Sequence, residues 1–236
     1  MSIYKDIALL NGRLLELPSS PVLVVGDVHG CYHTFKKFVE DHWDAENEVL
    51  IQVGDLINRG RHSTECVRYA RKLSKKYPGK VLFLLGNHEY RLLSYLKGKP
   101  NYKWVRKGSA QLLKDLSKDP DEYAKILKWI YKLPMAIETD YLFISHAGWS
   151  KKVRDPFAKS VALSLIHNRA VLKKMKKLQV IGHIPHKDGK PAFNERSNSW
   201  QIDTAACLGQ QLTGLRIKKK GEFQEIIQVE TDARDI

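Results

Sequence analysis

Five short segments contain most of the residues of this chain that could do metal chemistry. They are GDVHG (26–30), GDLINRG (54–60), GNHE (86–89), HAG (146–148) and GH (182–183). Their aspartates, asparagines and histidines offer carboxylate oxygens, amide oxygens and imidazole nitrogens, most of them beside a glycine. Mixed oxygen and nitrogen ligands suit Mn²⁺, Fe or Zn²⁺, and the lack of thiolates argues against a structural zinc site.

The spacing of these residues suits two neighbouring cations. Asp27 and His29 lie two residues apart on an extended segment, so both side chains point to one side and can share a cation. Asp55 ends the next apolar run in a second Gly-Asp pair and can bridge two cations, while His146 and His183 end later runs. Two such cations lower the pKa of water and neutralise the attacking and leaving oxygens at phosphorus. The residues therefore indicate a metal-dependent hydrolase of phosphate esters or anhydrides.

The elements that must position these residues can be read from apolar periodicity. Apolar runs at 22–25, 49–53 and 81–85 precede the first three motifs, and helical spacing predicts helices over 32–43, 62–77 and 89–96. This βαβαβ order predicts a parallel sheet with its functional residues in loops at the carboxyl ends of the strands.

The second half of the chain contains mainly short strand patterns. Strands are expected over 135–138, 141–145, 179–181, 200–202, 211–217 and 223–229, with one helix over about 160–174. Residues 97–132 are charged and helical in pattern, with Asp119-Pro120 as the start of a helix, and we expect them to form a cap-like insertion. The patterns predict an α/β fold, a central two-sheet sandwich flanked by helices, in one domain over 1–236.

In these motifs the chain resembles the calcineurin-like (PPP-type) metallophosphoesterases, over about residues 22–215. This family includes bacterial serine/threonine protein phosphatases and symmetrical diadenosine tetraphosphate hydrolases. The resemblance implies a four-layer αββα fold, two divalent metal ions (Mn²⁺ in vitro, with Fe or Zn²⁺ as alternatives) and direct attack on phosphorus by a metal-bridging water. It also implies the metal ligands Asp27, His29, Asp55, Asn87, His146 and His183.

The resemblance further implies residues that contact the substrate. Arg59 is expected to hold the phosphate, together with Asn87 and with Arg169, which falls where the family carries a second phosphate-binding arginine. His88 follows ligand Asn87 and is expected to be the general acid that protonates the leaving group. The bacterial branch of the family usually has a glycine at the position of Ala205, and we interpret the alanine as a local change in a turn.

The chain departs from the protein phosphatases at Asn58, where they have an aspartate paired with the general-acid histidine. A carboxylate would raise the pKa of His88, whereas an asparagine can only orient its ring. A serine alkoxide needs a proton when it leaves, but a nucleotide phosphate or a nitrophenolate does not. Asn58 therefore favours phosphoanhydrides or activated esters. The other interpretation is that Asn58 preserves the geometry at little cost.

Three functions remain open at this point. The first is a phosphomonoesterase similar to the protein phosphatases, and the second is a symmetrical diadenosine tetraphosphate hydrolase. Against the second, those hydrolases tend to read GNHD where this chain reads GNHE. The third is a basic nucleic-acid-binding protein on an inactive scaffold, although all the expected metal ligands are present.

Composition limits the partners and the cellular compartment that we expect for this protein. The formal net charge is +14, but the lysines and arginines are spread along the chain, which is typical of solvated surfaces. A phosphorylated small molecule, nucleotide or phosphoprotein is the expected partner, and nucleic acid is a weaker alternative. The 236 residues contain three cysteines without CxxC spacing, and no apolar run approaches the ~20 residues that cross a bilayer. We therefore expect a cytoplasmic protein that does not bind membranes.

Overall fold

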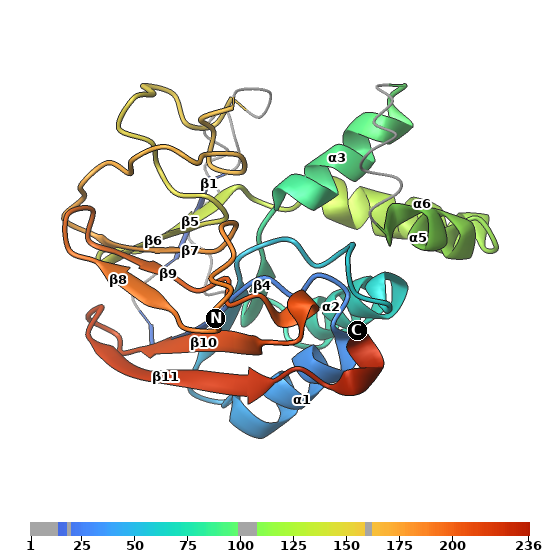
Figure 1. Ribbon diagram of the computed structural model, residues 1–236, viewed down its shortest axis with the longest axis horizontal. Coiled ribbons are helices and arrows are strands. Elements are labelled where there is room, and N and C mark those ends of the chain that lie inside the picture. The colour runs from blue at the N-terminus through green and yellow to red at the C-terminus, as the bar shows by residue number, and fades with distance from the viewer. Residues whose placement is uncertain (1–13, 18–19, 99–107, 159–161) are drawn as a thin grey trace.

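Two β-sheets form the centre of the computed structural model, which describes residues 14–17, 20–98, 108–158 and 162–236 (Figure 1). The five-stranded sheet has the order β11 (Phe223–Glu230), β10 (Gln211–Ile217), β2 (Val22–Val25), β3 (Val49–Gln52) and β4 (Val81–Phe83). The six-stranded sheet has the order β1 (Leu14–Glu16), β5 (Ala136–Glu138), β6 (Leu142–Ser145), β7 (Leu178–Ile181), β9 (Ser199–Gln201) and β8 (Ala192–Asn194).

The predicted βαβαβ unit forms the start of the five-stranded sheet. Helices α1 (Tyr32–His42) and α2 (Ser63–Lys76) connect β2, β3 and β4, which pair in parallel. Alternate strand residues face opposite ways. Leu23 and Leu50 pack in one core with α1 and α2, whereas Val24 and Ile51 pack in a second core between the sheets. Both strand faces are therefore buried, which explains the uninterrupted apolar runs. The expected α/β sandwich is confirmed.

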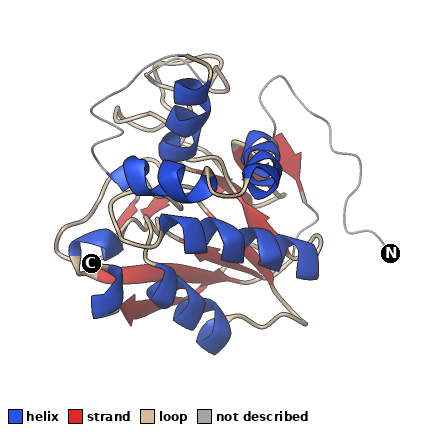
Figure 2. Ribbon diagram, turned by 90° about the vertical axis from the view of Figure 1, so that its right-hand side faces the viewer, coloured by secondary structure: helices blue, strands red, loops and turns tan. Residues whose placement is uncertain are grey.

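Three more helices lie on one side of the sandwich. They are α3 (Asn87–Leu96), α5 (Ala110–Leu116) and α6 (Pro120–Tyr131) (Figures 1 and 2). Helix α6 contacts α3 and α5, and both α5 and α6 contact α2. As expected, Asp119 precedes α6, and its carboxylate caps the helix by accepting the backbone N–H of Glu122. Helices α5 and α6 belong to segment 97–132, of which residues 99–107 lie outside the described residues. Its role as a cap stays a prediction.

The helix predicted over about 160–174 is wrong for residues 162–174, the part that the structure describes. Leu165 donates its N–H to Pro156 and accepts that of Ala147, and Asn168 accepts the N–H of Ala170. These bonds hold the segment in turns, since asparagine side chains offer the backbone an alternative to the helix. Strands β1 and β8 were not expected.

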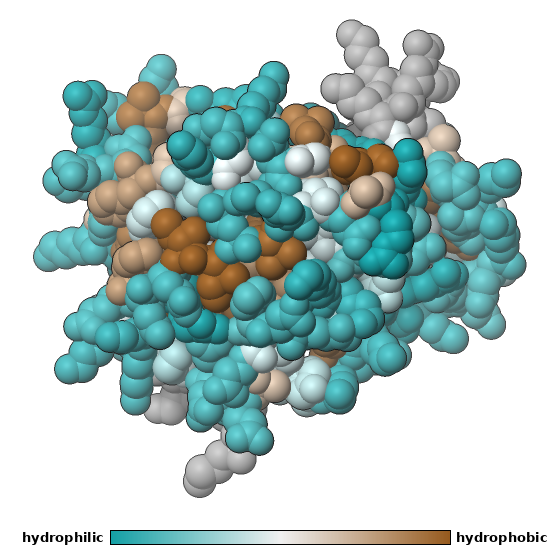
Figure 3. Space-filling view, turned by 60° about the horizontal axis from the view of Figure 1, so that its bottom comes forward, coloured by the Kyte–Doolittle hydropathy of each residue, from teal (hydrophilic) through white to brown (hydrophobic). Residues whose placement is uncertain are grey.

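The visible surface is mainly hydrophilic (Figure 3). On the face shown in Figure 3 most of the area is hydrophilic, and apolar side chains gather in a few patches. No helix among the described residues is both long enough and apolar enough to cross a membrane.

Candidate metal centre

The predicted ligands meet where the carboxyl ends of five strands come together. Three of these strands, β2, β3 and β4, belong to one sheet, and β6 and β7 belong to the other. The loops that follow parallel strands lie together at the carboxyl end of a sheet, and here the carboxyl ends of the two sheets adjoin. The site brings together six buried side chains: Asp27, His29, Asp55, Asn87, His146 and His183.

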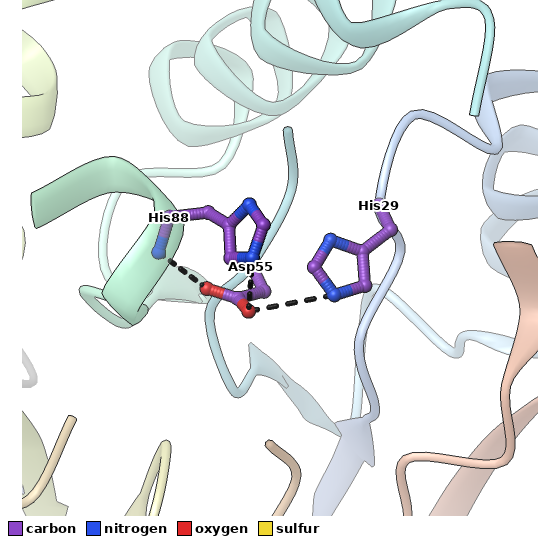
Figure 4. Close-up of side chains that lie close together, drawn as sticks. All are labelled: His29, Asp55 and His88. Atoms are coloured by element: carbon purple, nitrogen blue, oxygen red, sulfur yellow. Dashed lines mark hydrogen bonds and ion pairs between the residues drawn. The ribbon is translucent and has the colours of Figure 1, made fainter. Parts of the chain in front are cut away.

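The ligand atoms form two groups that share Asp55. In the first group, His29 Nε2 lies 3.4 Å from Asp55 Oδ2 (Figure 4). The same nitrogen lies 3.8 Å from Asp27 Oδ2. In the second group, His146 Nε2 lies 3.4 Å from the same Asp55 oxygen and 3.0 Å from Asn87 Oδ1. His183 completes the second group, with its Nδ1 3.0 Å from Asn87 Oδ1.

Backbone carbonyls orient two of the histidines as ligands. His29 Nδ1 lies 3.0 Å from the carbonyl oxygen of Ile57, and His146 Nδ1 lies 3.1 Å from that of Val53. A ring nitrogen that donates to a carbonyl leaves the lone pair on the other nitrogen, as in many metal-bound histidines. Both Nε2 lone pairs therefore face the oxygens of Asp55.

The donor set fits divalent cations. Carboxylate oxygens, an amide oxygen and imidazole lone pairs crowd together, and these groups repel one another unless a positive charge lies among them. The Nε2 atom of His183 is buried and has no hydrogen-bond partner within the described part of the chain. Oxygen and imidazole ligands of this kind suit Mn²⁺, Fe or Zn²⁺.

Close backbone contacts explain the glycines in the motifs. A Cβ at Gly182 would lie 1.9 Å from Asp27 Oδ1, and a Cβ at Gly86 would lie 2.2 Å from the backbone nitrogen of Asp55. The backbone of the site is also strained, because Asp55 and His183 have φ angles of 58° and 72° in the left-handed region. Strain of this kind is common where a fold must place functional groups.

The electrostatics of the site also favour bound cations. Burial, followed by the carboxylates of Asp203 and Asp55, raises the pKa of Asp27 well above its usual range. Burial alone would raise the pKa of Asp55 as well, but the neighbouring histidines, above all His146, hold it well below its usual range. Burial and then His146 lower the pKa of His183 to about 2, so its ring is neutral and able to bind a metal.

Asn58 and His88 form the hydrogen-bonded pair that the sequence predicts. His88 Nδ1 lies 3.0 Å from Asn58 Oδ1, and Asn58 Nδ2 donates to Ser109 Oγ over 2.5 Å. The second bond fixes the amide so that its oxygen accepts from His88, and neutral His88 then has its lone pair on Nε2. Burial lowers the pKa of His88 to about 3, although the charge of Asp55 raises it. His88 is therefore neutral near pH 7.

Two expected phosphate-binding arginines are exposed beside this centre. Arg59 has its guanidinium 3.8 Å from Cys207 Sγ, and its charge lowers the pKa of His88. Arg169 is exposed, and its charge lowers the pKa of His183. The half-buried Arg91 on α3 was not expected at the site, yet its charge also lowers the pKa of His88. Three cationic groups thus act on one site.

The sequence reasoning missed two buried carboxylates. Glu89 accepts backbone N–H groups from Asp55, Leu56 and Gly86 at 2.9–3.1 Å, and so holds the loop that carries Asp55. Burial raises the pKa of Glu89 to about 7. Asp203 follows β9, and its Oδ2 is buried without a partner among the described residues. In the sequence, Glu89 was visible as the last residue of the GNHE motif, and Asp203 was visible as an acidic residue just after a predicted strand.

The fold and the ligand cluster define a metal-dependent phosphoesterase. Residues 20–221 match the family described as calcineurin-like phosphoesterase, and the chain belongs to this family. It is therefore a hydrolase, as expected.

Two relatives illustrate the similarity in sequence. The "Bis(5'-nucleosyl)-tetraphosphatase, symmetrical" of Hamiltonella defensa is 33% identical over 157 residues, which cover 63% of this chain and 53% of that protein. The "Bis(5'-nucleosyl)-tetraphosphatase PrpE [asymmetrical]" of Bacillus subtilis is 28% identical over 225 residues, 82% of this chain and 89% of that protein. The chain spans about half the length of the symmetrical relatives it matches.

Solved structures show the same fold. A structure provisionally assigned as a diadenosine tetraphosphatase has a TM-score of 0.65 at 20% identity and covers 94% of this chain and 99% of its own. A protein serine/threonine phosphatase from Saccharomyces cerevisiae has a TM-score of 0.61 at 14% identity, with 94% and 84% covered.

Proposed function

We propose that the protein hydrolyses the phosphoanhydride bonds of dinucleoside polyphosphates at a dinuclear metal centre. The observation that carries this proposal is the pair of His88 and Asn58, which leaves the site without a protonated general acid near pH 7. A substrate whose leaving group is already a stable anion fits such a site better than an alkyl phosphate.

The metal ligands divide into two sets with Asp55 in common. Asp27, His29 and Asp55 would hold one cation, and Asp55, Asn87, His146 and His183 would hold the other. When bound, the two cations would lower the pKa of water and neutralise negative charge at the reacting phosphate. Mn²⁺ is the metal that we propose for assays in vitro, and Fe or Zn²⁺ would suit the same donors.

In this proposal His88 orients the attacking water and does not protonate the leaving group. Its Nδ1–H is held by Asn58, so its Nε2 lone pair faces the site 3.9 Å from Asp55 Oδ2. A neutral imidazole in this position accepts a hydrogen bond and orients the attacking water toward phosphorus. The departing nucleoside phosphate keeps its negative charge and needs no proton from the protein.

The arginines suit a chain of several phosphates. Arg59 and Arg169 are exposed at the centre, and Arg91 is half-buried there. Guanidinium groups bind phosphate oxygens in a planar, bidentate manner, and each can hold a different phosphate of one substrate. A phosphomonoester offers a single phosphate and would use fewer of them.

The relatives support the same substrate class. They are named as bis(5'-nucleosyl)-tetraphosphatases, some symmetrical and one asymmetrical. A phosphomonoesterase of the protein-phosphatase type is the second candidate, since Asn58 preserves the hydrogen bond to His88. Nothing in the comparisons supports the nucleic-acid-binding alternative. A nucleotide substrate and the free thiols of Cys31, Cys66 and Cys207 support a cytoplasmic location.

The test is Mn²⁺-dependent turnover of diadenosine tetraphosphate and of a phosphoserine peptide in one buffer at pH 7.5. We expect a higher kcat/KM for the dinucleotide, with products that anion-exchange chromatography separates into ADP alone or ATP and AMP. Asp55→Asn serves as the control for contaminating activity, because it removes the negative charge of the shared ligand. Faster release of phosphate from the peptide would establish the second candidate instead.

A further inference from the structure

A second cluster of potential metal ligands lies apart from the centre described above. His33 is on α1, His62 precedes α2, and Asp235 ends the short helix η3 (Ala233–Asp235). One ligand atom from each residue lies within 4.8 Å of those of the other two. The chain end that carries η3 lies beside α1 and α2 (Figure 1). None of the three residues belongs to the motifs that form the metallophosphoesterase site.

The two imidazoles are arranged as ligands of one ion. Their ring centroids are 5.0 Å apart with an interplanar angle of 84°. The Nε2 of His62 lies 2.9 Å from the carbonyl oxygen of Arg234 and donates to it. This bond leaves the lone pair of His62 on Nδ1, as the carbonyls of Ile57 and Val53 do for His29 and His146.

Hydrogen bonds hold the carboxylate of Asp235 in place. Its Oδ2 accepts from the backbone N–H and the hydroxyl of Thr34 at 2.8 and 2.7 Å, and its Oδ1 accepts from the N–H of His33 at 3.0 Å. A carboxylate has about four lone-pair sites, so one on Oδ1 is still available. Its position is thus fixed before any ligand binds, which lowers the entropic cost of binding.

Glu65 is placed to complete the coordination. Glu65 lies in the first turn of α2, and its Oε2 is 3.9 Å from His62 Nδ1. Two neutral imidazoles and two carboxylates balance the charge of a divalent ion. Nitrogen and oxygen ligands in a set of four suit Zn²⁺ or Co²⁺, whereas Ca²⁺ and Mg²⁺ prefer oxygen ligands alone.

We propose that His33, His62 and Asp235, with Glu65, form a separate zinc-type metal site that fastens η3 to α1 and α2. The site adjoins the loops of the main centre, because Arg61 donates its N–H to the carbonyl of Asp235 and His62 donates its N–H to that of Gly30. A bound ion would therefore stabilise the corner at which the loop with Asn58 and Arg59 ends and α2 begins.

The experiment measures zinc content after equilibrium dialysis of the full chain against buffered Zn²⁺. We expect His33→Gln and His62→Gln each to retain one zinc ion fewer per chain than the wild type. His42→Gln is the matched control, since His42 lies on α1 outside any ligand cluster of the described residues, and it should retain the wild-type content. Equal zinc content in all four proteins would overturn the proposal, as would an equal loss in the control.

A second measurement separates this site from the main centre. In an Asp55→Asn background, we expect Zn²⁺ to raise the Tm, and the added His62→Gln substitution to remove most of that rise. Circular dichroism without metal checks that both proteins are folded. An unchanged rise in Tm would show that zinc stabilises the chain elsewhere and would overturn the proposal.

Discussion

Replacement of Asn58 by aspartate tests the argument about the leaving group most directly. The introduced carboxylate would keep the geometry at His88, because its oxygen can accept from His88 Nδ1 as the amide oxygen does. Aspartate also tolerates the left-handed backbone at this position, where φ is 72°. The substitution therefore adds a charge with little change in shape.

The size of the effect follows from the distance. Asn58 Oδ1 lies 3.0 Å from His88 Nδ1. A full charge at about 4 Å from the ring stabilises the imidazolium by ~4 kcal/mol at an effective dielectric constant of ~20. This corresponds to ~3 pKa units and moves the pKa of His88 from about 3 to ~6. The protonated fraction at pH 7 then rises about a thousandfold, which sets an upper limit for the gain with a substrate that needs an acid.

The assay compares kcat/KM for a phosphoserine peptide, p-nitrophenyl phosphate and diadenosine tetraphosphate between pH 5 and 8. In Asn58→Asp we expect a large gain for the peptide, which falls as pH rises through ~6 because the imidazolium is lost. At pH 7 and above, where His88 stays mostly neutral in the variant as well, the other two substrates should change by less than about threefold. Asn47→Asp, which adds the same charge in an exposed turn before β3, is the control. Equal gains for all three substrates would refute the reasoning.

Four further substitutions test the structure of the centre. Asp55→Asn should leave less than about a tenth of kcat/KM, and more than that would show that Asp55 is not the shared ligand. Gly182→Ala should displace the carboxylate of Asp27 and lower both metal content and activity, which elemental analysis and Mn²⁺ titration would detect. Glu89→Gln should lower the free energy of unfolding in urea by ~2 kcal/mol, because an amide leaves buried N–H groups unpaired; an unchanged midpoint would contradict this. Ala205→Gly should raise the same free energy by ~1 kcal/mol, since the φ angle of Ala205 is 58°.

Local patterns were sufficient for the framework of the site. Strands β2 and β3 bury both faces, and β4 buries one face and half-buries the other, so their apolar runs were visible without knowledge of their neighbours. The βαβ order then placed Asp27, Asp55 and Asn87 at one edge, because parallel strands end on the same side. The left-handed backbone at Ala205 also agrees with the glycine that the family has there.

Long-range contacts decided what the sequence could not show. Residues 162–174 form turns because their backbone groups bond to distant segments, which overrides their helical periodicity. Ser109 reaches Asn58 across 51 positions, and Asp235 meets His33 across 202, with no spacing rule that connects them. A motif shows which metal-ligating side chains a loop carries, because these side chains belong to neighbouring residues in the sequence. Packing between elements far apart in the chain decides which other side chains orient those ligands. The same packing decides whether a second cluster of ligands forms. Only the tertiary structure determines these two features.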